Sequence, residues 1–95
     1  MNTAVYKYPL HEKVKLPKEA EILKVAWHKT PVQEAAFIWA LVDLDATEEE
    51  ERTFQLIVTG GVVKDNNLLV KPTYLDSLFC YGGSYVLHVF ENIKL

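Results

Sequence analysis

The chain has 95 residues, of which 49% are hydrophobic and 12% aromatic, and its formal net charge is −3. This length suits a single domain spanning residues 1–95, and the negative balance argues against a nucleic-acid partner, because nucleic-acid binding relies on clustered Lys and Arg. A lone cysteine, a start without a signal-peptide pattern and the lack of an apolar run of about 18 residues predict a cytoplasmic protein with no internal disulfide and no membrane partner.

The first predicted strand covers residues 4–10. Its side chains alternate, with Tyr6 and Tyr8 on one face and Lys7 on the other. Pro9 cannot donate a hydrogen bond to a neighbouring strand, so we expect this strand to end there or to lie at the edge of a sheet.

The next two strands are predicted at residues 13–16 and 21–28. The second of these segments also fits a helix, because Leu23 and Trp27 have helical spacing as well as a shared strand face. We favour the strand because its β-forming apolar residues and its polar residues fall on opposite parities.

The most apolar segment, residues 35–43, predicts a central strand that is covered on both faces. Residues 53–59 are expected to pair with it as a hairpin across the acidic loop 44–51. Within that loop, Thr47 and Glu50 match a capping box, which predicts one helical turn.

The C-terminal third contains two apolar runs, residues 74–81 and 85–91, joined by Gly82, Gly83 and Ser84 in a tight hairpin. The last run is largely apolar on both sides. The whole pattern therefore predicts a mostly β protein, a compact antiparallel meander of about six or seven short strands. We expect it to form a curled sheet or a small sandwich or barrel with at most one short helix.

No set of residues completes a catalytic or metal-binding motif, so we expect no enzyme activity, no metal and no cofactor. Cys80 lies among apolar residues and is interpreted as a buried, inert thiol. Ser84 is interpreted as a turn residue. His88 has two readings, a satisfied core histidine or part of an aromatic wall that grips a ligand.

Two further features suggest an anion. Thr59, Gly60 and Gly61 can cradle a phosphate through backbone N–H groups, although they also fit a plain strand-ending turn. Arg52, the only arginine, is the natural charged partner for such an anion, and otherwise an exposed residue at the start of a strand.

Several stretches of the chain resemble a family of small proteins encoded by bacteriophages and prophages. The similar stretches follow one another in order and span nearly the whole chain: Val-Tyr-Lys-Tyr-Pro-Leu at 5–10, Leu-Pro-Lys-Glu-Ala-Glu-Ile-Leu-Lys-Val at 16–25, Ile-Trp-Ala-Leu-Val-Asp at 38–43, Thr-Gly at 59–60 and His-Val-Phe-Glu at 88–91. This chain departs from the family at residues 61–63, where it has Gly-Val-Val and the relatives often have Gly-His-Pro.

The resemblance implies a non-enzymatic phage protein that sequesters a small nucleotide-derived immune signal of the host, and the apolar composition fits a homo-oligomer. The ligand contacts expected from this function are stacking on Trp27, Tyr81 and His88 and phosphate contacts to Arg52, Thr59 and Gly60. An alternative is a protein-interaction module that inhibits a host defence protein through a sheet edge or an aromatic patch. A third reading is a small hydrolase or lyase with His88 as its base.

Overall fold

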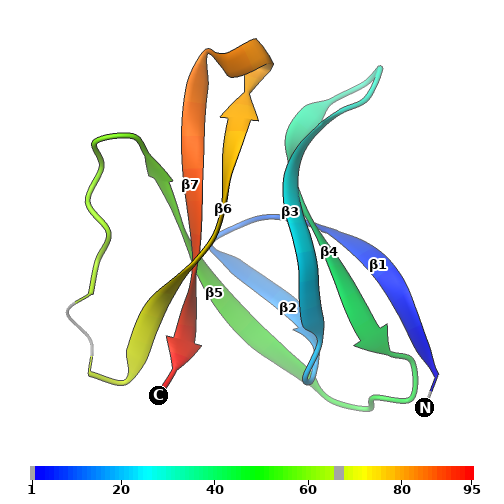
Figure 1. The fold of residues 1–95 in the computed structure, drawn as a ribbon. Coiled ribbons are helices and arrows are strands. Elements are labelled where there is room, and N and C mark those ends of the chain that lie inside the picture. Colours follow the sequence, from blue (N-terminus) through cyan, green and yellow to red (C-terminus); the bar gives the residue numbers. More distant parts are fainter. Residues whose placement is uncertain (1, 66–67) are drawn as a thin grey trace.

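The computed structural model describes residues 2–65 and 68–95 and is mostly β, as the sequence pattern predicts. Seven antiparallel strands form two sheets, which lie on either side of the molecule in Figure 1. The three-stranded sheet has the order β1-β4-β3, from Thr3–Pro9, Glu34–Asp43 and Glu21–Lys29. The four-stranded sheet has the order β2-β5-β7-β6, from Lys13–Pro17, Glu49–Val58, Tyr85–Lys94 and Val70–Cys80.

The strand β4 is the middle strand of its sheet, as predicted, and it carries much of the core. Ile38, Ala40 and Val42 point toward the four-stranded sheet and are at most 1% exposed. Phe37 and Trp39 have the opposite parity and point outward. No second layer is needed to shield Phe37, which is only 6% exposed because side chains of the flanking strands cover it.

The predicted hairpin between residues 35–43 and 53–59 is wrong. Both edges of β4 are already occupied, by β1 and by β3, and a strand has only two edges. After Asp43 the chain therefore crosses to the other sheet, where β5 pairs with β2 and β7. The alternation of apolar residues predicts each strand but does not determine which strands become neighbours.

The helical turn predicted at Thr47 is also wrong. A turn covers residues 44–45, and Glu50, the expected capping residue, already belongs to β5, opposite Leu16 of β2. Its carboxylate accepts a hydrogen bond from the backbone N–H of Glu19 at 3.2 Å instead of capping a helix. Within the described residues the only helical element is η1, the short 3-10 turn Tyr81–Gly83.

The segment 21–28 is a strand, as favoured, and Val25 and Trp27 face the core as expected, but Leu23 does not. The register shifts between Ile22 and Lys24, which is the mark of a β-bulge. Leu23 is consequently 47% exposed, and Ile22 packs against the core in its place.

The hairpin of β6 and β7 forms at the predicted place. It contributes Cys80 and Val89 to the core. Ser84 donates its hydroxyl to the carbonyl of Tyr81 at 2.9 Å, which confirms its role in the turn. Cys80 is fully buried, and burial raises the pKa of its thiol. The neighbouring strand β7 turns Val89 inward and His88 outward, and this alternation positions the candidate site.

Candidate functional site

The candidate site lies on the outer face of the four-stranded sheet around His88. Val89 and Leu87 belong to the core or pack against it, so His88 points away from the core. Its cross-strand partners are Ile57 on β5 and Ser77 on β6. The structure therefore excludes the reading of His88 as a core histidine and leaves it half-buried on an open sheet face.

Both ring nitrogens of His88 are hydrogen-bonded to hydroxyl groups. Ser77 Oγ lies 2.8 Å from Nδ1, and Thr59 Oγ1 lies 2.8 Å from Nε2. The phenol of Tyr74 extends the series, with its oxygen 2.7 Å from Ser77 Oγ. We call these four residues the hydroxyl–imidazole chain.

The hydroxyl–imidazole chain can bind either a hydrogen-bond donor or a hydrogen-bond acceptor of a ligand. A neutral imidazole donates from one nitrogen and accepts at the other, and each hydroxyl can donate or accept by rotating. Reversing the direction of every hydrogen bond therefore leaves all four groups satisfied. Tyr74 and Thr59 are exposed, so both ends of the chain are within reach of a ligand.

An aromatic pair lies beside the chain. The rings of Tyr74 and Phe90 have centroids 5.6 Å apart and meet edge to face. Phe90 follows His88 by two residues on β7 and so shares its outer face. The site thus combines hydrogen-bonding groups with an aromatic surface.

A turn built on two glycines positions Thr59. Gly60 has φ of 90°, a left-handed conformation that favours glycine. A Cβ on Gly61 would lie 2.8 Å from Cγ2 of Ile57, so this position has no room for a side chain. After the turn the chain folds back along β5, where the side chain of Gln55 exchanges two hydrogen bonds with the backbone of Lys64 at 2.8 and 2.9 Å.

Arg52 lies elsewhere and is not free to meet a phosphate. Its Nε donates to Glu91 at 2.6 Å and its Nη2 donates to the same carboxylate at 3.0 Å, while Nη1 donates to the carbonyl of Ala20. These hydrogen bonds to Glu91 raise the pKa of the guanidinium. Arg52 is therefore a partly buried structural residue and not the exposed one that the alternative reading expected.

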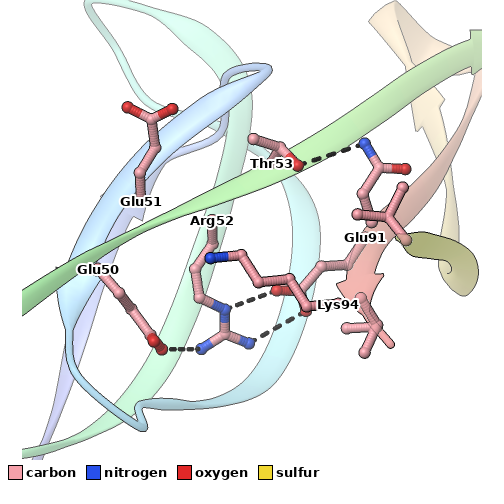
Figure 2. Close-up of a pocket in the computed structure, with 9 residues that line it drawn as sticks. Glu50, Glu51, Arg52, Thr53, Glu91 and Lys94 are labelled. Carbon is pink, nitrogen blue, oxygen red and sulfur yellow. Dashed lines mark hydrogen bonds and ion pairs between the residues drawn. The ribbon is translucent and has the colours of Figure 1, made fainter. Parts of the chain in front are cut away.

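Figure 2 shows the surroundings of this ion pair, with the guanidinium held between Glu50 and Glu91 and the side chain of Lys94 alongside. The hollow that they line measures about 550 Å³ and begins where the ladder between β5 and β7 ends, at Phe54 and Glu91. Its carboxylates outnumber its cations, so it does not favour an anion.

Trp27 and Tyr81 meet each other at the end of the molecule where the β3–β4 and β6–β7 turns lie (Figure 1). Their ring centroids are 4.8 Å apart, and the indole N–H of Trp27 donates to Glu34 at 2.7 Å. Tyr81 has a positive φ of 50°, which is uncommon for an aromatic residue, and its ring also lies 5.7 Å from that of Tyr85. The expected stacking set is thus divided, since His88 is on the outer face of the sheet.

Comparison with known proteins gives one result that spans the molecule. Residues 1–95 match the model of a family described as a domain of unknown function, DUF7352. The chain belongs to this family. No curated protein and no solved structure matches it.

The geometry of this DUF7352 domain shows which signals sequence reasoning missed. The structure pairs Cys80 with Tyr85 and so places Ser77 opposite His88, whereas the predicted loop 82–84 pairs Tyr81 with Tyr85 and would place Leu78 there. The register shift between Tyr74 and Asp76 is a second feature that the sequence pattern did not indicate, and it brings Tyr74 to Ser77.

Two further features of the DUF7352 domain concern metal binding and membrane-spanning helices. Among residues 2–65 and 68–95, no three His, Cys, Asp or Glu side chains are close enough together to hold a metal ion. The same part of the chain contains no helix that is long and apolar enough to span a membrane.

Proposed function

We propose that this DUF7352 domain is a non-enzymatic binding protein that takes a small nucleotide-like ligand on the outer face of its four-stranded sheet. The observation that carries the proposal is the hydroxyl–imidazole chain beside the ring of Phe90. A nucleobase has a flat face for stacking and an edge of donors and acceptors, and these are the two things the site offers.

The surroundings of His88 favour binding over catalysis. In a catalytic triad a carboxylate orients the histidine and stabilises the imidazolium that forms during the reaction. Here uncharged hydroxyls, those of Ser77 and Thr59, hold both nitrogens. The carboxylate that a catalytic triad needs is therefore not among the hydrogen-bond partners of this imidazole.

The phosphate contribution is expected to be small. Arg52 is engaged by Glu91, so the donors offered to a phosphate near His88 are uncharged, namely the backbone N–H groups of the turn at Thr59 and Gly60 and the hydroxyls of the hydroxyl–imidazole chain. We therefore expect a nucleoside to bind nearly as tightly as its nucleotide. The biological role that the phage resemblance implies, sequestration of an immune signal, remains part of this proposal.

The proposal is tested by titrating adenosine, AMP, ADP-ribose and a cyclic dinucleotide into the protein, with the melting temperature and NMR shifts as readouts. Thr59→Val removes one hydroxyl at nearly constant shape, and we expect it to weaken binding by about tenfold, the effect of roughly 1.4 kcal/mol. Thr73→Val is the matched control, because the Thr73 hydroxyl bonds only the nearby carbonyl of Lys71 at 3.4 Å.

Three results would count against the proposal. The site assignment fails if Thr59→Val and Thr73→Val bind the nucleoside equally well, or if the shifts gather around Trp27 and not around His88. Binding itself is refuted if none of the four probes changes the melting temperature or the spectrum. Recovery of a chemically altered probe would establish an enzyme in place of a binding protein.

A second candidate function rests on a different surface. Phe79 is 68% exposed on the outer face of β6, and Tyr81 and Tyr85, 50 and 41% exposed, contact each other at the end of the β6–β7 hairpin. Strand β6 is the last strand of its sheet, so one of its edges has no paired strand, and β3 lies beside this edge near Leu75 without pairing with it. Aromatic residues beside an open edge suit strand addition, by another protein or by a second copy of the chain.

This candidate is separated from the first by Phe79→Lys, which adds a charge at the unpaired edge strand β6 while leaving the hydroxyl–imidazole chain in place. Sedimentation of the parent protein is expected to show a homo-oligomer, and the variant is expected to sediment as a smaller species with unchanged nucleoside binding. If the parent protein is monomeric at high concentration, this surface does not mediate self-association.

A further inference from the structure

The outer face of the three-stranded sheet carries an arrangement that the proposed function does not use. Trp39 is on the middle strand, and its cross-strand partners are Lys7 on β1 and Lys24 on β3. The side chains of directly opposite residues share one face of a sheet. A half-buried indole is thus flanked by a lysine on each side.

Lys7 is held in place by three contacts. Its Nζ lies 4.1 Å from the centroid of Phe37 and 5.7 Å from that of Trp39, distances at which an ammonium is attracted to the ring. The same Nζ lies 3.1 Å from Nδ1 of His28. An ammonium is a donor only, so Nδ1 of His28 is the acceptor in this bond.

These contacts leave the charge of Lys7 without an anionic partner among the described residues. An ammonium has three N–H groups, and only the bond to His28 uses one of them for a hydrogen bond. The acidic residues on this face are Glu21 and Asp43, and they pair with Leu41 and Thr3 farther along the strands. The two residues directly opposite Trp39 on the flanking strands, Lys7 and Lys24, are both cations.

We propose that this face binds an aromatic ring that carries an anionic group, such as an aryl phosphate or carboxylate. The ring stacks on Trp39, and the anion lies between the ammonium groups of Lys7 and Lys24. Phe37 and His28 fix Lys7 in advance, so little side-chain freedom is lost when the ligand binds. This site is on the opposite side of the molecule from the hydroxyl–imidazole chain and does not depend on it.

The alternative is purely structural, with Lys7 serving to fasten the edge strand β1 across β4 to β3. The two readings differ in what they require of Lys24. This lysine is exposed and takes no part in the contacts of Lys7, so it does not help to hold β1 in place. A ligand site needs both lysines, whereas a fastening role needs only Lys7.

The test is a titration of the full chain with phenyl phosphate, followed by NMR at the Trp39 indole and the His28 ring. Inorganic phosphate and benzyl alcohol each carry half of the proposed chemistry and serve as control probes. We expect saturable shifts with phenyl phosphate and shifts at least about tenfold weaker in apparent affinity with either control probe.

Lys7→Met and Lys24→Met keep an aliphatic side chain and remove the charge. Each is expected to weaken phenyl phosphate binding by about five- to tenfold, the range of one lost charged contact. Lys71→Met is the matched control, an exposed lysine on β6 of the other sheet, and is expected to bind like the parent.

Several outcomes overturn the proposal. It fails if Lys24→Met binds phenyl phosphate like the parent, and this variant decides the matter even if Lys7→Met does not fold. It also fails if benzyl alcohol binds as well as phenyl phosphate. Shifts confined to His88 and Thr59 would refute this site while supporting the proposed function.

Discussion

The two outer faces of the molecule stabilise the same kind of strand in different ways. On the four-stranded sheet, His88 is satisfied by uncharged hydroxyls on both sides. On the three-stranded sheet, His28 and the rings of Phe37 and Trp39 surround the ammonium of Lys7. The first face is a network of interchangeable hydrogen bonds, and the second is a cation packed on aromatic rings.

The difference teaches how a strand can be apolar on both sides without a third layer. On β4, the outward Phe37 is 6% exposed, with the ammonium of Lys7 over its ring and the ring of His28 against it edge to face. On β7, the outward Phe90 is only half-buried, and its neighbour His88 contributes hydrogen bonds in place of burial. Substitutions on a face stabilised by packing and on a face stabilised by hydrogen bonds should therefore change the free energy of unfolding by different amounts.

The largest effect is expected below the four-stranded face, where the carboxylate of Glu91 is buried and paired with Arg52. Glu91→Gln removes one partner of the buried bidentate pair with Arg52 and is expected to reduce the free energy of unfolding by about 3–5 kcal/mol. Urea denaturation measures it. The control is Lys18→Met, which breaks an exposed ion pair with Glu48 and should cost less than about 1 kcal/mol.

Equal effects of Glu91→Gln and Lys18→Met would show that the interior pair contributes no more than a surface one. In that case the buried pair of Arg52 and Glu91 would not be a source of stability that sets the four-stranded sheet apart from the three-stranded one.

The second effect compares one ring on each face. Phe37→Ala is expected to cost about 3 kcal/mol, because Phe37 is almost fully shielded; the value is at the lower end for a buried phenylalanine because Phe37 lies outside the core cluster. Phe90→Ala should cost about 1 kcal/mol, close to the value of its edge-to-face pair with Tyr74. Thermal or urea unfolding of both variants gives the comparison, with the exposed Phe79→Ala as a control near zero.

If Phe90→Ala costs as much as Phe37→Ala, the four-stranded face is closed in solution by something that covers Phe90. A second copy of the chain is then the first candidate, and the unfolding midpoint of the parent would rise with protein concentration.

The sequence predicts the strands well and their neighbours poorly, for a physical reason. The apolar pattern of a segment is a local property, so it identified β4 from a continuous apolar run and the β6–β7 hairpin from two runs around contiguous turn residues. Which edges are occupied depends on residues far apart, and the pairing of β4 with β1 and β3 is set by the core as a whole.

The candidate site follows the same rule. Thr59, Gly60 and His88 were identified from local patterns and do lie together. The expected roles of Arg52 and Trp27 depended on distant partners, Glu91 and Tyr81, that no local pattern gives. Lys7 and Trp39 were overlooked because each is ordinary alone, and only strand pairing places them opposite one another.

The smallest expected effect on stability separates a binding face from a structural one. Ser77→Ala removes the link between Tyr74 and His88 and should cost only about 0.5–1.5 kcal/mol, because water can replace the hydroxyl on a half-buried face. Ser84→Ala, which removes a hydroxyl from the turn, is its control. Since the hydroxyl–imidazole chain is proposed to meet the ligand, Ser77→Ala should weaken nucleoside affinity by about tenfold while Ser84→Ala leaves it unchanged. A Ser77→Ala protein that loses stability but binds adenosine like the parent would show that the four side chains only hold the sheet together.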